Sequence, residues 1–199
     1  MISPLLANIY LDPLDVLMAA RGYQMVRYAD DFVIPCRTRT EADEALALVA
    51  VWVTENGLVL HPSKTHVGDC RVPGQGFEFL GYRFEAGRRF VRKKSLAKLK
   101  DSIRDKTGRC GGVSLERVIA DLNPVLRGWF GYFKQAHPTT FADVDGFVRR
   151  RLRSMLLKQK KKSHIGFGTL IHKTWPNAFF ADAGLFALKT AWQSAIQPR

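Results

Sequence analysis

Cysteine is scarce in this sequence of 199 residues, which also shows no long apolar run and no N-terminal leader pattern. The three cysteines, Cys36, Cys70 and Cys110, are odd in number and far apart, so they fit reduced thiols better than disulfides. The five histidines form no zinc-ligand spacing beside them, which excludes a zinc nuclease module. No run of about 18 apolar residues exists, which predicts that the chain spans no membrane. The N-terminus has neither a basic region nor a cleavable signal, so we expect a cytoplasmic protein.

Acidic residues are in short supply in the second half of the chain. Residues 1–94 carry 12 Lys and Arg against 11 Asp and Glu, whereas residues 95–199 carry 19 against 7. The formal net charge of +13 therefore lies almost entirely in the second half. This one-sided charge predicts binding to a polyanion, above all a nucleic acid. The plainer alternative is a lysine-rich solvated surface, although such surfaces usually mix both signs.

Two adjacent carboxylates, Asp30 and Asp31, lie between two short runs of β-forming residues. Met25-Val26-Arg27 precedes Tyr28-Ala29-Asp30-Asp31 and Phe32-Val33-Ile34 follows it, which predicts a hairpin over about 24–37. Like charges repel and turn tips usually hold Gly or Asn, so the pair is costly unless a divalent cation binds there. Nucleotidyl transfer by two Mg²⁺ ions about 4 Å apart needs carboxylates held in this rigid way. The alternative is an ordinary acidic turn.

Apolar spacing predicts helices on both sides of this hairpin and throughout the second half. We expect a helix at 2–20, bent or divided at Pro13, and a second helix from Thr40, with Asp43 completing a capping box. Extended segments are expected at 58–60, 65–67 and 77–83, and Gly87 should mark a turn back to Phe90 and Val91. The later helices are expected at 96–106, at 114–135 with an optional break at Asn123-Pro124, from Thr140 with Asp143 as its capping partner, and at 185–195.

Four blocks of the first half resemble consecutive reverse-transcriptase motifs, in the expected order. They are Ile2–Leu11, Tyr28–Asp31, the segment from Gly57-Leu58 to Pro62-Ser63-Lys64-Thr65, and Phe79-Leu80-Gly81-Tyr82. The second half is similar to the thumb, or maturase domain, of group II intron-encoded proteins, through Leu122-Asn123-Pro124, Arg127-Gly128-Trp129, Tyr132-Phe133 and the helix from Phe141. The resemblance covers almost the whole chain. It implies the C-terminal part of a group II intron reverse transcriptase/maturase.

The resemblance implies an α+β fold and a division into domains. A partial polymerase palm, an antiparallel sheet with helices on one face, is expected at 1–93. An all-α thumb or maturase-specific domain would follow at 94–162, and a C-terminal tail with a short helix at 163–199. The family reaction is RNA-directed DNA synthesis from dNTPs on a DNA primer with two Mg²⁺ ions. The second family role is binding of group II intron RNA to assist splicing.

The same resemblance assigns roles to individual residues. Asp30 would be a metal ligand and Asp31 a weaker or indirect one. Lys64 would stabilise charge on the incoming triphosphate or donate a proton to it. The residues expected to meet the nucleotide and the primer are Ser3, Pro4, Tyr28, Ala29, Leu80, Gly81 and Tyr82.

A basic run at 149–162 holds eight cations and no acidic residue. On a helix, Arg149 and Arg153 would share a face opposite the apolar stripe of 144–152, which leaves the outer side for phosphates. A solvated cationic face is the alternative, and for Trp129 the choice is between stacking on a base and packing in the core. The residues expected at the RNA surface are Arg127, Trp129, Arg149, Arg150, Arg153, Lys158, Lys160, Lys161 and Lys162.

The sequence departs from the family pattern at its start. The resemblance requires a further palm aspartate upstream of the first helix, together with fingers, and Asp12 and Asp15 on that helix do not replace it. We therefore expect no polymerisation by this chain alone, and a complementing N-terminal polypeptide would be a further partner. Three alternatives stay open: an RNA-binding splicing factor with a relic palm, a DNA-binding protein unrelated to polymerases, and a fragment that folds only with its missing strands.

Overall fold

The computed structural model describes residues 3–108, 112–160 and 169–196, and it divides the chain into two compact units. The N-terminal unit comprises Met1–Leu80 and Phe84–Gly87. The C-terminal unit comprises Gly81–Arg83 and Arg88–Arg199. The mixture of helices and two small antiparallel sheets confirms the expected α+β class. No helix in the described segments is long and apolar enough to cross a bilayer.

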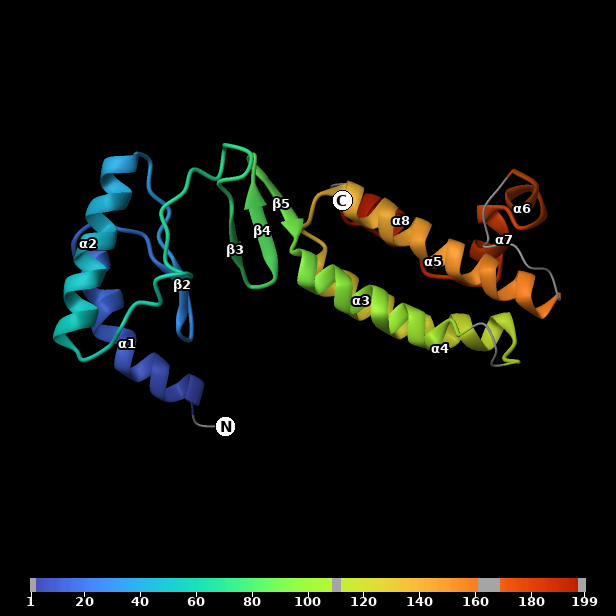
Figure 1. The fold of residues 1–199 in the computed structure, drawn as a ribbon, viewed down its shortest axis with the longest axis horizontal. Helices are drawn as coiled ribbons and strands as arrows, with labels where there is room; N and C mark the ends of the chain where they lie inside the picture. The colour runs from blue at the N-terminus through green and yellow to red at the C-terminus, as the bar shows by residue number, and fades with distance from the viewer. Residues whose placement is uncertain (1–2, 109–111, 161–168, 197–199) are drawn as a thin grey trace. The chain divides into compact units, whose positions relative to one another are not determined.

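The N-terminal unit packs two helices against a small hairpin (Figure 1). Its elements are α1 (Ser3–Ala20), β1 (Val26–Tyr28), β2 (Asp31–Val33), α2 (Arg39–Glu55) and β3 (Phe77–Phe79). Its core consists of Leu14 and Met18 from α1 and Ala45, Val49 and Val53 from α2. Partly buried side chains of the hairpin, Met25, Phe32 and Ile34, pack against this core. The hairpin is thus held by helices that the apolar spacing predicts.

The two helices differ from expectation only in detail. The first, α1, runs unbroken through Pro13. The second begins earlier than expected, because Thr38 is its N-cap and accepts a hydrogen bond from Glu41 N at 3.1 Å. The expected capping box of Thr40 and Asp43 is therefore wrong. Asp43 pairs with Arg39 instead, one turn away at 2.9 Å.

The single strand expected over 77–83 is wrong, because this segment is a hairpin. After β3 the chain turns at Leu80 and Gly81, whose φ angles are +48° and +81°, and then continues as β4 (Tyr82–Glu85). Two successive positive φ values are typical of a tight two-residue turn. A second such turn at Ala86 and Gly87 leads to β5 (Arg88–Val91), which confirms the turn expected at Gly87. The strand order is β3-β4-β5, and residues 58–60 and 65–67 lie outside the strands.

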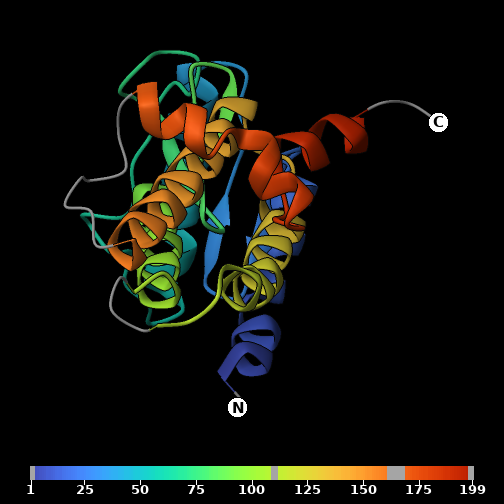
Figure 2. The same ribbon diagram turned by 90° about the vertical axis from the view of Figure 1, so that its right-hand side faces the viewer.

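The C-terminal unit is helical apart from the residues it takes from β4 and β5. Its helices are α3 (Lys93–Lys106), α4 (Leu115–Phe133), α5 (Pro138–Gln159), α6 (Thr169–Thr174), α7 (Asn177–Asp182) and α8 (Leu188–Ile196). The helices α3, α4 and α5 run alongside one another in both views (Figure 1, Figure 2). One core joins all six helices, and the expected tail at 163–199 contributes Ile171, Trp175, Phe180 and Leu188 to it.

Two expected helix boundaries in this unit are not observed. Helix α4 continues through Pro124 without a break, so Asn123 caps no second helix. The Asn123 side chain instead donates to Gly184 O at 2.9 Å and accepts from Phe186 N at 2.8 Å. These bonds hold the segment between α7 and α8. Helix α5 begins at Pro138 rather than at Thr140, because proline suits the first helical position.

A buried carboxylate fixes the start of α8. Asp145 on α5 is 5% exposed and accepts hydrogen bonds from Leu188 N at 2.9 Å and Lys189 N at 3.0 Å. Backbone N–H groups at the start of a helix have no partner inside it, so a carboxylate placed there satisfies them and interacts favourably with the helix dipole. A side chain of α5 therefore caps a helix more than forty residues away in sequence.

Replacing this carboxylate should destabilise the C-terminal unit. We expect Asp145→Ala to lower the free energy of unfolding by about 1–3 kcal/mol, because one buried and one partly buried N–H group lose their acceptor. Asp145→Asn should cost less. Urea unfolding followed by tryptophan fluorescence measures this, since Trp129, Trp175 and Trp192 all lie in this unit. The control is Asp143→Ala, an exposed position on the same helix, and an equal loss in both variants would contradict the prediction.

Candidate metal-binding hairpin and cationic helices

The tip of the β1–β2 hairpin presents both carboxylates to solvent. Tyr28 pairs with Asp31 in the antiparallel register, which leaves Ala29 and Asp30 as a two-residue turn. Asp30 and Asp31 are exposed, and Tyr28 is 66% exposed. Ala29 has a φ of +54°, a left-handed conformation that costs a residue with a Cβ about 1–2 kcal/mol. Surrounding contacts must offset this cost, and strain of this kind often marks a functional turn.

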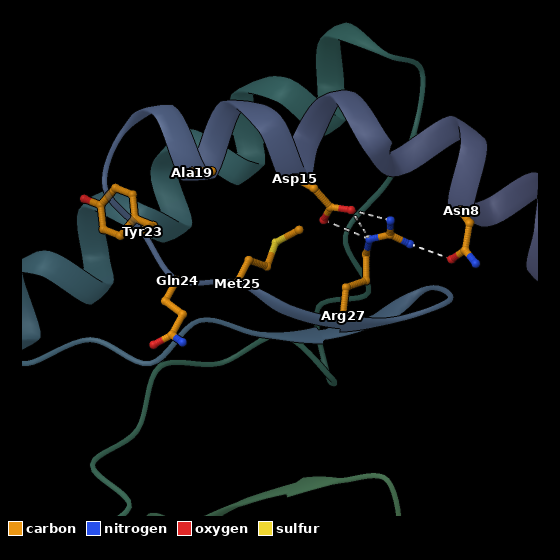
Figure 3. A pocket seen from close by; sticks show the side chains of 7 residues that line it. All are labelled: Asn8, Asp15, Ala19, Tyr23, Gln24, Met25 and Arg27. Carbon is orange, nitrogen blue, oxygen red and sulfur yellow. Dashed lines mark hydrogen bonds and ion pairs between the residues drawn. The ribbon is translucent and has the colours of Figure 1, made fainter.

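Arg27 supplies those contacts (Figure 3). Its Nε donates to the two Asp15 carboxylate oxygens at 2.9 and 3.0 Å, and its Nη2 also donates to Asp15. Its Nη1 donates to Asn8 Oδ1 and to Ala29 O, each at 2.9 Å. The side chain is only 10% exposed, and the hydrogen bonds to Asp15 raise the pKa of the guanidinium. One arginine therefore ties the strained hairpin tip to α1.

A hollow of about 610 Å³ lies beside this anchor. Its lining residues come from α1, β1 and the connection between them: Asn8, Asp15, Ala19, Tyr23, Gln24, Met25 and Arg27 (Figure 3). Arg27 and Asp15, the charged pair in the lining, are already bonded to each other. Asp30 and Asp31 are not among the lining residues, so this hollow is not the metal site expected at the hairpin tip.

The hairpin tip offers carboxylate oxygens, which are suitable ligands for Mg²⁺, but only from two residues. Mg²⁺ is commonly held by one or two carboxylates, with waters and substrate phosphates completing the octahedron. Asp30 in the turn and Asp31 at the start of β2 supply that number of carboxylates. Within the described part of the chain, no group of three or more His, Cys, Asp or Glu side chains could hold a metal ion. Asp15 is committed to Arg27, so it is no third ligand.

The other residues expected at the nucleotide and primer lie on separate elements. Ser3 and Pro4 begin α1, and Pro4 is exposed. Lys64 is exposed on the loop between α2 and β3, where its backbone N–H donates to His61 O at 3.0 Å.

Further along this loop Asp69 forms an ion pair with Arg71. The hydrogen bonds from Arg71 lower the pKa of the Asp69 carboxyl to about 2, so the ion pair is lost only in strong acid.

Gly81 and Tyr82 belong to the C-terminal unit, and packing explains both. A Cβ on Gly81 would lie 3.3 Å from Phe133 Cζ and 3.5 Å from Ser95 Oγ, so glycine is favoured by space as well as by its φ angle. Tyr82 donates its hydroxyl to Tyr132 O at 2.7 Å, and its ring contacts Phe133. Leu80 at the same turn is 38% exposed. This tight turn therefore has a structural basis independent of any primer.

The charge asymmetry is sharper in the structure than along the sequence. The C-terminal unit carries 25 Lys and Arg against 7 Asp and Glu, a balance of +18. The N-terminal unit carries 6 against 11, a balance of −5. The difference from the sequence-based division arises because six cations at 83–94 fold with the helices. A cationic helical unit is thus joined to an acidic one, which supports polyanion binding by the former.

The expected position of Arg153 on an outer, phosphate-binding face is wrong. The residue is 2% exposed. Its Nε donates to Trp175 O and its Nη2 to Asn177 Oδ1, both at 2.9 Å, and its guanidinium lies 5.2 Å from the Phe180 ring centroid. Burial lowers the pKa of the guanidinium. The side chain points inward because Trp175 and α7 cover it, a contact that the local sequence pattern does not reveal.

Arg151 is a second inward-directed arginine, with a role that the basic run by itself does not indicate. It donates from Nε to Thr107 Oγ1 and from Nη2 to Thr107 O, both at 3.0 Å. Thr107 is the C-cap of α3, where carbonyl groups lack helical partners and a cation is favoured. Thr107 is fully buried, and that burial becomes visible only when α3 and α5 are placed together.

The remaining cations of the run stay nearer the surface. Arg149 and Arg150 are partly buried, and Lys158 and Lys160 are exposed. The Lys160 ammonium lies 5.2 Å from the Trp175 ring centroid. Lys161 and Lys162 lie outside the described residues. The exposed face is therefore smaller than the continuous run suggests.

Arg127 and Trp129, both on α4, have different surroundings. Arg127 is exposed, with its guanidinium 5.4 Å from the Phe186 ring. Trp129 packs against Phe133 at 4.9 Å and Phe141 at 6.3 Å between ring centroids. Its Nε1 is buried, and among the described residues it has no hydrogen-bond acceptor. The ring thus occupies the aromatic core, the simpler of the two interpretations of this residue.

Two family models match the chain, and the boundary between the two matches lies close to the boundary between the two compact units. Residues 1–84 match the family described as "Reverse transcriptase (RNA-dependent DNA polymerase)". Residues 96–175 match "Group II intron, maturase-specific domain". The chain belongs to the group II intron reverse transcriptase/maturase family. A search of curated proteins gave no significant match.

The extents of the two matches coincide with structural features. The reverse-transcriptase match ends within β4, close to the point at which the compact units divide. The maturase-specific match ends at Trp175, whose carbonyl accepts the hydrogen bond from Arg153. Both partners of this buried contact therefore lie inside the maturase-specific domain.

Removal of the Arg27 anchor should loosen the hairpin tip. We expect Asp15→Ala to destabilise the N-terminal unit by about 1–3 kcal/mol, because a nearly buried guanidinium loses its carboxylate partner. Backbone amides at 26–33 should then exchange with deuterium faster than in the wild type. The control is Asp12→Ala, which removes an exposed carboxylate from the same helix. Unchanged exchange in Asp15→Ala would show that Arg27 does not hold the tip.

Proposed function

We propose that this chain carries part of a nucleotidyl-transfer site on its N-terminal unit and binds group II intron RNA through its C-terminal unit. The observation that carries the proposal is the exposed Asp30–Asp31 pair on a strained turn anchored by Arg27. Ala29 at this turn is left-handed, and its carbonyl accepts a hydrogen bond from the partly buried Arg27, which holds the turn in one conformation. The family match adds that reverse transcriptases share this part of the chain.

In this proposal the carboxylates of the hairpin would hold Mg²⁺. Asp30 acts as a direct ligand and Asp31 as a weaker or indirect one. When bound, Mg²⁺ would supply Lewis acidity to the primer hydroxyl and neutralise triphosphate charge. Lys64 stabilises negative charge on the incoming triphosphate. Ser3 and Pro4 at the start of α1 would lie under the nascent base pair, and Tyr28 and Ala29 would let the strand approach the carboxylates. Leu80, Gly81 and Tyr82 would support the primer end.

These 199 residues should not polymerise DNA by themselves. Two-metal transfer needs carboxylates that together coordinate both ions, and the hairpin supplies two neighbouring side chains. A further carboxylate must come from outside the described residues, so a complementing N-terminal polypeptide is the partner that we propose. DNA primer, template and dNTPs are substrates of the completed site.

RNA binding is the activity that the chain itself should show. A balance of +18 over one helical unit favours sequence-independent contacts to phosphates, whose strength falls steeply with salt. The maturase-specific match points to intron RNA as the natural ligand. A second candidate, an RNA-binding splicing factor with a relic palm, is favoured by the absence of a three-ligand metal group in the described segments.

Two assays on the purified chain test the proposal. Filter binding of a group II intron RNA should give tight binding with a negative slope of log affinity against log salt, about 0.7–0.9 for each phosphate contacted. Primer extension with Mg²⁺ and dNTPs should give no incorporation above a no-enzyme control. Incorporation would show that the chain holds a complete site, and preference for duplex DNA over structured RNA would refute the RNA-binding half.

The double substitution Asp30→Asn, Asp31→Asn separates the two proposed roles. It removes the carboxylate charge and keeps the size of both side chains. We expect RNA affinity to stay within about twofold of the wild type, because phosphate contacts set it. Polymerisation in the presence of an added upstream segment should be lost. If the added segment restores activity equally to both proteins, the hairpin is not the metal site; if it restores neither, the relic-palm alternative is favoured.

A further inference from the structure

Two of the four arginines at 149–153 are used inside the protein, which changes where a phosphate can bind. Arg151 caps α3, and Arg153 is buried against Trp175 and α7. The phosphate-binding surface expected from the basic run therefore cannot follow α5 alone. Cations of a neighbouring helix must contribute if this side of the unit grips a polyanion.

Three cations from two helices gather around one aromatic ring. The ring is that of Phe147 on α5, which is 9% exposed. The Lys100 Nζ lies 5.6 Å from its centroid, and the guanidinium carbons of Arg104 and Arg150 lie 5.4 and 5.2 Å from it. Lys100 and Arg104 are one turn apart on α3, and Arg150 belongs to α5. We call these four side chains the Phe147 patch.

The Phe147 patch brings like charges together at a cost that an anion would relieve. Each cation gains about 0.5–1 kcal/mol from the ring at an exposed site, which holds it in place. Arg104 also pairs with Asp101 on α3, and this carboxylate offsets one of the three charges. Cations already held near one point lose little side-chain freedom when they bind a phosphate, so the geometry is favourable for tight contact.

We infer that the Phe147 patch is a phosphate-binding site for the RNA backbone, formed jointly by α3 and α5. The inference rests on the proposed RNA binding and adds where the strand is gripped. An RNA backbone is favoured over an acidic protein segment because the positive charge extends over the whole unit, with 25 cations against 7 acids. A long polyanion matches so extended a charge, and arginine binds phosphate in a bidentate manner.

A charge-matched pair of triple variants tests the inference. The patch variant is Lys100→Gln, Arg104→Gln, Arg150→Gln. The control variant is Lys98→Gln, Lys173→Gln, Lys189→Gln, which removes the same charge at exposed positions outside the patch. Fluorescence anisotropy with a labelled RNA stem-loop, measured over a salt series, reports affinity and slope. Circular dichroism confirms that both variants are folded.

The patch variant should lose at least about tenfold in affinity, and its salt slope should fall by about two relative to the wild type. The control should change much less. The charge-preserving variant Arg104→Lys, Arg150→Lys should keep the wild-type slope, since the number of cationic contacts is unchanged. If the patch triple does not fold, Lys100→Gln and Arg104→Gln are measured singly, and each should reduce the slope by about 0.7–0.9.

Equal losses in the patch and control variants would overturn the inference and leave RNA binding itself intact. Absence of RNA binding by the wild type would instead refute the proposed function, so the two failures are distinguishable. An acidic peptide is titrated as a second probe. If it binds more tightly than RNA and only its binding depends on the patch, the site belongs to a protein partner and the inference is wrong.

Discussion

The guanidinium of Arg27 joins α1, the strand that carries it and the tip of the acidic hairpin. It reaches α1 through Asp15 and Asn8 and the tip through the carbonyl of Ala29. These hydrogen bonds are partly shielded from solvent, and they hold a left-handed alanine beside two like charges. Without this anchor the tip would be a strained loop on a two-stranded sheet, which is marginally stable alone. The placement of Asp30 and Asp31 therefore depends on it.

The C-terminal unit uses the same chemistry to hold its last helices. Arg153 binds the segment between α6 and α7, Asn123 binds the segment before α8, and Asp145 caps α8. Each is a polar side chain on a long helix that satisfies backbone or amide groups of a distant segment. Burial makes such contacts specific, because an unsatisfied polar group inside a core is costly. The unit has a charge balance of +18, and two of its cations, Arg151 and Arg153, are used in its own assembly.

Much of the fold was predictable where local patterns are strong. The first helix, the hairpin around Tyr28–Asp31 and the long helices of the second half all carry clear periodicity or capping signals. The errors fall where two patterns compete within a few residues. Thr38 and Thr40 both have an acidic residue three positions later, and Thr38 is the N-cap, with its side chain accepting from Glu41 N. The segment 77–83 alternates like one strand, but left-handed Leu80 and Gly81 divide it.

The sequence by itself determined the family, the acidic pair between β-forming runs and the surplus of cations in the second half, because these depend on residue identity and order alone. Only the tertiary structure decided which cations are available. Arg151 and Arg153 face inward, whereas Lys100, Arg104 and Arg150 meet around Phe147. The physical reason is that a helix period places a side chain on one face of its own helix. Whether that face is solvent or core depends on which distant helix packs against it.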